Sequence, residues 1–476
     1  MPVEINRFSA ERYDAMPRLV VIGAGISGLS AAHAARWEAE RRARALEIIV
    51  FERDRQAGGK ARSLKEDGFL VEAGPTGYLD NEPLLDRLSE SVGLAKRPAN
   101  AAAARRFLVR GGRMREIHLN PLKFCMSGIL SPLGMARVAL EPFIAARSYD
   151  TQAEDESILS FAERRLGKEL ARRMIAPMVL GVFAGDAGEL SAGAAFPRLV
   201  ELEREHGSLI RAMIALKRSR RPSGGPAGPS GTLTSFDDGL QELPLALGRS
   251  QAIDLRCGCE VRSITARKAS GYRLQVDDDE IDADAVVLAS ESWNSASLIA
   301  PLAPVAAREL AAIPTPPVTV VALGFAPSMR DAAPTGFGVL IPRGEGFRIL
   351  GCLWDSHLFP GREPEGHLLL RVMLGGAVDP QVADLDDDEV MQTVLEDLRR
   401  LMPRLGKPLY KQIIRWARAI PQYTLGHAAR LRSIDEDLAR HPGIHLAGNA
   451  CRGIAFTKAA TAGARSGKEA ARRLLA

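Results

Sequence analysis

The sequence predicts an α/β fold with α+β elements: a Rossmann-like domain that binds a dinucleotide, a mostly antiparallel substrate-domain sheet, and a helical insertion. Three observations predict this class. The glycines Gly23, Gly25 and Gly28 stand between an apolar run and a helical pattern. Short β-branched runs alternate with Gly and Pro between residues 316 and 376, and Leu, Ile, Met and Ala recur at helical spacing over 120–217.

The glycine motif follows the apolar run Leu-Val-Val-Ile at 19–22, which reads as a strand, and precedes a predicted helix. Glycines at this junction allow a tight turn, a close approach of the backbone to a ligand, and close packing of the helix on the strand. The helix N-terminus then presents free N–H groups to an anion. The motif therefore predicts a pyrophosphate-binding site.

A second predicted strand, 47–51, ends in Glu52. A carboxylate at this place can accept hydrogen bonds from ribose hydroxyls, which argues against a cofactor with a 2′-phosphate. The acidic residue falls later than the usual spacing of about 20 residues, because good helix formers from Trp37 onward lengthen the first helix.

Composition limits the function classes. The 476 residues are 46% apolar and 25% charged, which suits a globular protein of two or three domains, and no apolar run is long enough to span a bilayer. The N-terminus lacks the apolar core of a signal peptide, so a cytoplasmic location is expected. Five cysteines without a framework predict a reducing environment, and the pair Cys257 and Cys259 predicts a strand with small residues and no metal. The basic run 217–221 has no interleaved aromatic residues, so it indicates a solvated segment or a contact with anionic lipid and not nucleic acid.

The predicted domains are assembled from separated pieces of the chain. A stretch of Gly, Pro and Ser, 218–231, predicts a linker loop, and a helix is expected to open at 236–243. The dinucleotide-binding domain is predicted at 16–95, 232–305 and 413–476, the substrate domain at 96–119 and 306–412, and the helical insertion at 120–217.

The run Gly-Gly-Lys-Ala-Arg at 58–62 follows Glu52, and such a glycine doublet with basic residues resembles the FAD-dependent amine oxidase superfamily. Further segments are similar, in the same order, to the protoporphyrinogen oxidases, so the resemblance covers nearly the whole chain. These segments are 181–186, 189–191, 196–197, 205–209, 335–342, 415–423 and 447–453.

The resemblance implies FAD as cofactor and the six-electron oxidation of protoporphyrinogen IX to protoporphyrin IX in haem biosynthesis, by successive hydride transfers to the flavin with O2 as acceptor. A single Gly-x-Gly-x-x-Gly favours an oxidase over a monooxygenase, since no site for NADPH is evident. The resemblance also implies that the helical insertion binds membrane lipid peripherally on the cytoplasmic face, a homodimer, and hand-over of product to a ferrochelatase. Three alternatives stay open: a coproporphyrinogen III oxidase, an amine or polyene oxidase, and a non-catalytic carrier of flavin or porphyrin.

The resemblance further assigns residues to the site. Gly181, whose missing side chain would leave room for the macrocycle, and Phe183 are placed near the reacting carbon. Four residues are assigned to the substrate: Arg97, Leu340, Leu350 and Met373, the last a departure from the aromatic residue of many family members. No general base is nominated, since His33 and His206 are expected to be structural. The residues assigned to FAD are Gly23, Gly25, Ile26, Ser27, Gly28, Glu52, Arg53, Gly59, Lys60, Ala61, Arg62, Gly74, Pro75, Thr76, Val261, Trp416, Gly448, Asn449, Ile454 and Ala455.

Overall fold

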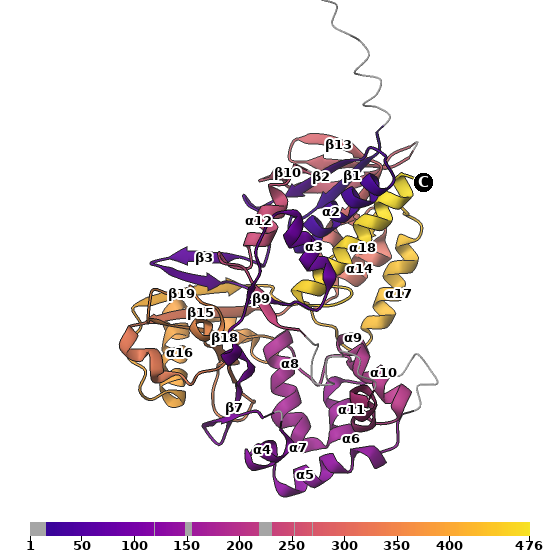
Figure 1. Ribbon diagram of the computed structural model, residues 1–476. Coiled ribbons are helices and arrows are strands. Elements are labelled where there is room, and N and C mark those ends of the chain that lie inside the picture. Colours follow the sequence, from indigo (N-terminus) through magenta and orange to yellow (C-terminus); the bar gives the residue numbers. More distant parts are fainter. Residues whose placement is uncertain (1–15, 119, 148–154, 219–230, 252, 269) are drawn as a thin grey trace, which may run out of the picture.

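The computed structural model describes residues 16–118, 120–147, 155–218, 231–251, 253–268 and 270–476 (Figure 1). A parallel sheet with its helices occupies one end of the molecule, and an antiparallel sheet and a group of helices occupy the other. The mixed α/β class predicted from the sequence is therefore confirmed. The described residues leave out 219–230. They therefore omit all of the predicted linker 218–231 except its two end residues, and they omit the last three residues of the basic run 217–221.

The parallel sheet contains the two strands predicted beside the glycine motif. Its strands follow the order β10-β2-β1-β14-β20, and every neighbouring pair is parallel. Helices or a second sheet cover both faces, so the central strands are apolar and buried along almost their whole length. The bounds are β1 Arg18–Ile22, β2 Glu47–Glu52, β10 Asp254–Cys257, β14 Ala285–Leu288 and β20 Ile444–Leu446.

The first and last helices of the described residues lie side by side on one face of this sheet, as the indigo and yellow ribbons of Figure 1 show. These are α2 (Ile26–Arg41) and α18 (Phe456–Leu474). Gly463 and Gly467 of α18 permit the contact: a Cβ on either would lie 1.9 Å from a carbonyl oxygen of α2, that of Ser27 or of Ala31. Small residues thus let the C-terminal segment close the dinucleotide-binding domain.

The opposite face is covered by an antiparallel sheet of β11 (Val261–Ala266), β12 (Tyr272–Val276) and β13 (Asp279–Ala283). The helices α13 (Ser292–Ile299), α14 (Pro304–Ala311) and α17 (His427–Leu438) pack beside it.

The helix expected at 236–243 begins later, because α12 spans Glu242–Gly248. Gly239 has φ +94°, and a Cβ on it would lie 2.2 Å from Oγ of Ser63. This backbone conformation is incompatible with a helix, so the segment before Gln241 is a turn.

The second large sheet follows the order β19-β15-β18-β17-β16-β7-β8 and is antiparallel except where β16 meets β7. Helix α16 (Asp387–Leu401) covers one face, and the other face turns toward α8. The predicted antiparallel sheet is therefore present. Its bounds are β7 Arg106–Arg110, β8 Arg113–Glu116, β15 Val318–Phe325, β16 Gly338–Leu340, β17 Gly351–Leu353, β18 Leu368–Gly375 and β19 Tyr410–Trp416.

Between residues 120 and 218, the described residues form helices joined by turns and loops. In α8 (Ala176–Phe183), Val179, Leu180 and Phe183 are buried, so this helix packs inward. Pro177 lies in the first turn of α8, directly after a π turn at Ala171–Ile175 that accommodates its missing N–H. The other helices are α4 Pro121–Met126, α5 Pro132–Ala139, α6 Ile158–Leu166, α7 Lys168–Leu170, α9 Ala192–Ala195, α10 Pro197–His206 and α11 Leu209–Arg218.

Exposed apolar side chains gather on α4, α5 and the 3-10 turn Glu141–Phe143. Four of them are 76–86% exposed, and we call them the apolar tip: Leu122, Met126, Leu133 and Phe143. None of the helices in the described ranges combines the length and the apolar character needed to cross a membrane.

Candidate functional site

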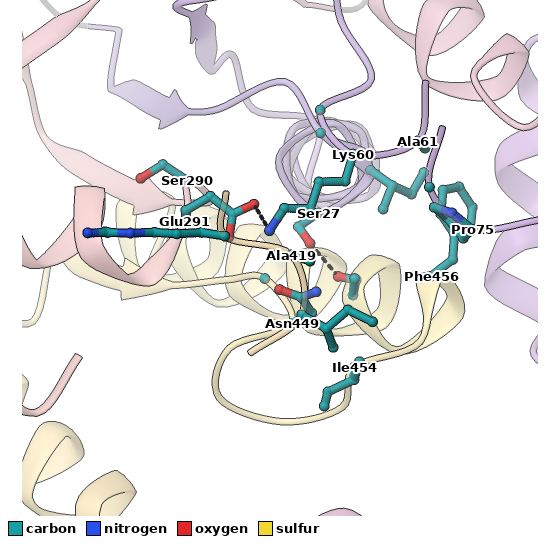
Figure 2. A pocket seen from close by; sticks show the side chains of 18 of the residues that line it. Ser27, Lys60, Ala61, Pro75, Ser290, Glu291, Ala419, Asn449, Ile454 and Phe456 are labelled. Atoms are coloured by element: carbon teal, nitrogen blue, oxygen red, sulfur yellow. Dashed lines mark hydrogen bonds and ion pairs between the residues drawn. The ribbon is translucent and has the colours of Figure 1, made fainter. Parts of the chain in front are cut away.

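A long cavity of about 1680 Å³ runs from the carboxyl ends of β1 and β2 to the face of the antiparallel sheet that meets α8. Pockets for single small ligands usually measure about 300–1000 Å³, so this cavity has room for a dinucleotide and a second ligand. Its walls come from the first, middle and last parts of the chain. Figure 2 shows Ser27, Lys60 and Pro75 from the first part facing Asn449, Ile454 and Phe456 from the last.

The glycine motif forms a cradle at one wall of the cavity. Gly25 is the N-cap of α2 with an extended backbone and no side-chain cap, so the first N–H groups of the helix are free for an anion. A Cβ on Gly25 would face open space, and Gly23 has φ +104°. Together with Ile26 and Ser27 these glycines line the cavity. Gly28 does not line it: a Cβ there would lie 1.8 Å from the Gly23 carbonyl oxygen, so this third glycine serves the packing of helix on strand.

Glu52 ends β2 at the same wall. Its carboxylate accepts hydrogen bonds from the N–H of Ala24 at 2.7 Å and of Asp54 at 2.9 Å, which fixes its orientation beside the cradle. Arg53, Arg62 and Val261 line the cavity around it. This arrangement suits a ribose with free hydroxyls next to an adenine.

A cluster of charged and aromatic side chains occupies the middle of the cavity. Lys60 pairs with Glu291 at 2.7 Å, a contact drawn in Figure 2. The Lys60 Nζ lies 5.4 Å and the Arg418 guanidinium 4.8 Å from the centre of the Trp293 ring. Of this cluster, only Lys60 was predicted as a site residue. Glu291 and Trp293 belong to no recognisable motif, and Arg418 lies within the predicted segment 415–423 but was not singled out.

Predicted residues from two further segments also line the cavity. These are residues 72–76, which we call the 72–76 segment, and residues 448–455, which we call the C-terminal turn. Trp416 lines the cavity too, but its indole N–H donates to the Ala73 carbonyl oxygen at 2.7 Å and is not free for a ligand. The remaining predicted cofactor residues at the cavity wall are Gly59, Ala61, Gly74, Pro75, Thr76, Gly448, Asn449, Ile454 and Ala455.

Tyr423 holds the C-terminal turn in place. Its hydroxyl accepts from the Gly453 N–H at 2.6 Å and donates to the Asn449 carbonyl oxygen at 2.5 Å, and its ring stacks on His427 at 4.1 Å. Burial raises the pKa of the Tyr423 hydroxyl, which stays protonated and able to donate. The predicted segment 415–423 contains this residue, but its role depends on the tertiary contact with residues 449–453.

The far end of the cavity is apolar. Phe183 from α8, Val318 and Val320 from β15, and Met373 from β18 line it, and Ile454 packs in the same cluster as Phe183. Gly181 lines the cavity as well, and a Cβ on it would lie 2.4 Å from Cδ2 of Leu340, so the Leu340 side chain occupies the direction in which a side chain at 181 would project. The roles of Gly181 and Phe183 toward a substrate stay predictions.

Three predicted substrate residues do not line the cavity. Leu340 packs against Gly181, and Leu350 is buried in the cluster that contains Met373. Arg97 is exposed on the short strand Arg97–Pro98 and pairs with Asp237 at 2.5 Å. Its contact with a carboxylate of the substrate stays a prediction, to which the structure adds no support.

The histidines of the first helix and of the insertion are placed as expected. His33 is buried, its Nε2 lies 3.1 Å from the Leu247 carbonyl oxygen, and burial lowers its pKa. His206 ends α10, and its Nε2 lies 3.8 Å from Glu205. Neither is among the residues that line the cavity.

Comparison with known proteins decides the family. The model of the flavin containing amine oxidoreductases matches residues 26–475. The chain belongs to this family. It is accordingly a flavin-dependent oxidase, and its cofactor is FAD, as the sequence predicts.

Individual members of the family are similar over most of their length. The chain is 30% identical to the coproporphyrinogen III oxidase of Bacillus subtilis over 455 residues, which is 93% of this chain and 95% of that protein. It is also 30% identical to protoporphyrinogen oxidase 1 of Spinacia oleracea chloroplasts, over 92% of this chain and 81% of that protein. A solved structure from Exiguobacterium sp. 255-15, described there as a proposed protoporphyrinogen oxidase, is 27% identical and superposes with a TM-score of 0.79 over 96% of this chain and 98% of that one.

The residues at the cavity wall fit FAD. The uncapped start of α2 suits the pyrophosphate, and the Glu52 carboxylate suits the ribose. Lys60, the 72–76 segment and the Gly448–Asn449 turn leave the middle of the cavity for the ribityl chain and the ring. The apolar end beyond them is left for a substrate.

Proposed function

We propose that this flavoprotein oxidises protoporphyrinogen IX to protoporphyrin IX in haem biosynthesis, with O2 as electron acceptor. The observation that carries the proposal is the apolar end of the cavity, which continues past the predicted ring site and suits a broad apolar macrocycle. The names of the relatives support the same class of substrate, a porphyrinogen.

FAD bound in the cavity would supply the acceptor for hydride removed from the macrocycle. The chain's own task is then positioning and exclusion of water. Phe183, Val318, Val320 and Met373 surround the apolar end and keep a ring in contact with side chains instead of solvent. Orientation of this kind can supply much of the rate enhancement of a hydride transfer. We assign no side chain as general base.

The charge of the cavity wall favours a substrate with few carboxylates inside it. Arg371 is the single charged residue among the described residues that line the cavity from α8, α9, β15, β17 and β18. It already pairs with Asp355 at 2.9 Å. Protoporphyrinogen has two propionates and coproporphyrinogen has four. Burial of coproporphyrinogen would therefore leave more carboxylates without a partner. Coproporphyrinogen III remains the second candidate, because the Bacillus subtilis relative is named for it.

We also propose that the apolar tip rests on a lipid surface, so that the protein is peripheral on the cytoplasmic face of the membrane. Four largely exposed apolar side chains on neighbouring helical elements form a surface of the kind that enters a bilayer interface. The apolar tip, and not α8, is the segment suited to this contact. A homodimer and hand-over to a ferrochelatase rest on the resemblance alone.

The test is a competition between two substrates. Purified protein with bound flavin is given protoporphyrinogen IX and coproporphyrinogen III together in air, and each porphyrin is quantified by fluorescence after separation. Faster formation of protoporphyrin is expected. Preference for coproporphyrin would favour the second candidate, and absence of turnover above autoxidation would reject both.

Anaerobic mixing with either substrate adds a control for a non-catalytic carrier. An enzyme bleaches its flavin under these conditions, whereas a carrier leaves the flavin spectrum unchanged. Amines and polyenes are the substrates to test if the flavin is not reduced.

A further inference from the structure

Three consecutive backbone carbonyl groups, those of Glu72, Ala73 and Gly74, are held by side chains from the antiparallel sheet, and the last two of these residues line the cavity. The Glu72 and Gly74 oxygens accept from Nη1 of Arg371 at 2.8 and 2.9 Å. The Ala73 oxygen between them accepts from Nε1 of Trp416 at 2.7 Å. Strands β18 and β19 of the antiparallel sheet therefore hold residues 72–74, which directly precede Pro75 and Thr76 at the cavity wall.

Arg371 makes most of these contacts and has no free donor group. Its Nη2 also donates to Oγ1 of Thr76, and its Nε donates to Asp355 at 2.9 Å. The side chain is in the middle of β18, and the residue is only 1% exposed. A buried arginine is costly unless its charge and its donors are all satisfied, and here every partner except Asp355 belongs to the 72–76 segment.

The same strand links this segment to the apolar end of the cavity. Arg371 and Met373 are two residues apart on β18, so both side chains point to the same face of the sheet, and both line the cavity. Arg371 pairs with Leu353 and Met373 with Gly351 in the β17 register, so the strand is supported on that side.

We propose that Arg371 is a positioning residue that fixes the 72–76 segment against the antiparallel sheet, and so sets the flavin-ring part of the cavity relative to the substrate end. The planar fork of the guanidinium is what allows it, because it reaches two carbonyls, a hydroxyl and a carboxylate in one geometry. A lysine at this position offers a single point of charge and can keep only part of this set. The inference rests on the proposed arrangement of cofactor and substrate along the cavity, but not on the identity of the substrate.

A matched control is available at the same domain junction. Arg362 is likewise buried, with 2% exposure, and donates to Oγ of Ser235 and the Phe236 carbonyl oxygen at 2.9 and 3.1 Å. It lies 3.6 Å from the Glu72 carboxylate but does not hold the carbonyls of residues 72–74 and does not line the cavity. Arg362→Met therefore reports the cost of losing a buried arginine, with its charge pairing to the Glu72 side chain, while the carbonyl contacts of residues 72–74 stay in place.

The experiment compares Arg371→Met, Arg371→Lys and Arg362→Met as flavin-loaded proteins. FAD release on dilution is followed by the rise in flavin fluorescence, and the visible circular dichroism of the bound flavin reports its surroundings. We expect Arg371→Met to release FAD at least tenfold faster than the unchanged protein and to alter the dichroism. The FAD release rate of Arg371→Lys should lie between those of Arg371→Met and the unchanged protein. Arg362→Met should keep the dichroism spectrum and release FAD within about twofold of the original rate.

Two results would overturn the proposal: an unchanged release rate and spectrum in Arg371→Met, or equal changes in Arg371→Met and Arg362→Met. If Arg371→Met does not fold, Thr76→Val removes one acceptor of Arg371 and should change the dichroism in the same direction, and an unchanged spectrum would count against the inference. These readouts need no porphyrinogen, so failure of the proposed reaction leaves them interpretable.

Discussion

A methyl group added at Gly463 should push apart the two helices that close the phosphate cradle. An ideal Cβ at this position lies 1.9 Å from the Ser27 carbonyl oxygen, and ordinary contact begins at 3.4 Å, so α18 and α2 must separate by about 1.5 Å. The atom met is backbone and cannot rotate away. Ser27 also lines the cavity and is tied to α18 through its Oγ, which donates to the Ala459 carbonyl oxygen at 3.0 Å.

Two opposing terms give the expected magnitude. Replacing Gly by Ala inside a helix gains about 1 kcal/mol of stability from helix propensity. Overpacking a close contact costs about 1–3 kcal/mol, and the upper part of this range applies because neither side can yield. The free energy of unfolding should therefore fall by about 1–2 kcal/mol, which corresponds to a decrease in Tm of about 1–2 °C for a chain of 476 residues.

Thermal unfolding of the flavin-loaded protein, followed by circular dichroism and flavin fluorescence, measures this effect. Gly467→Ala makes the same 1.9 Å contact with the Ala31 carbonyl oxygen, one turn farther from the cradle. Gly467→Ala should lower Tm by a similar amount, but it should weaken FAD binding less than Gly463→Ala does. Lys468→Ala, on the exposed side of α18, should leave both quantities nearly unchanged. A Tm for Gly463→Ala at or above that of the unchanged protein would refute the reasoning, since propensity alone would then dominate.

Three further predictions concern the cofactor, pH and the surface. Glu52→Gln should weaken FAD binding about tenfold, because the charged acceptor is lost beside the Ala24 N–H, and an unchanged dissociation constant in a fluorescence titration would contradict the assigned role. Burial lowers the pKa of His445 to about 4, so the unfolded chain binds the proton more readily. The contribution of His445 to the free energy of unfolding should therefore be complete above pH 6.5 and fall toward pH 4 by at most about 1.4 kcal/mol per pH unit. In denaturant titrations at a series of pH values, the free energy of unfolding of His445→Asn should depend less steeply on pH. Replacing the four apolar-tip residues by serine should abolish co-sedimentation with anionic liposomes without changing Tm by more than a few degrees, and equal sedimentation of both proteins would reject lipid contact by this surface.

Much of the cofactor region could be predicted because its chemistry resides in local sequence. Gly23 and Gly25 are needed for the backbone of a strand-to-helix turn, and Glu52 follows directly from the end of a strand. Such requirements act between residues close in the chain, so spacing alone reveals them. The pattern of short β-branched runs predicted the antiparallel sheet, and the family resemblance extended the predicted site to the C-terminal turn. The domain boundaries stay a prediction.

The wall of the cavity depended instead on contacts between distant segments. Arg371 is a single charge within the apolar run of β18, and only the fold brings it to residues 72–76. Tyr423 lies in a predicted motif, yet its hydroxyl acquires a role through Asn449 and Gly453. Conversely, Arg97 carries the right charge for a carboxylate, but the fold leaves it exposed and paired with Asp237. Local sequence thus specified the strand-to-helix turn, its glycines and the acid after the second strand, because backbone geometry is a local property. Which side chains meet in the cavity was decided by tertiary structure, because those contacts join residues as much as 432 positions apart in the chain, as Ser27 and Ala459 are.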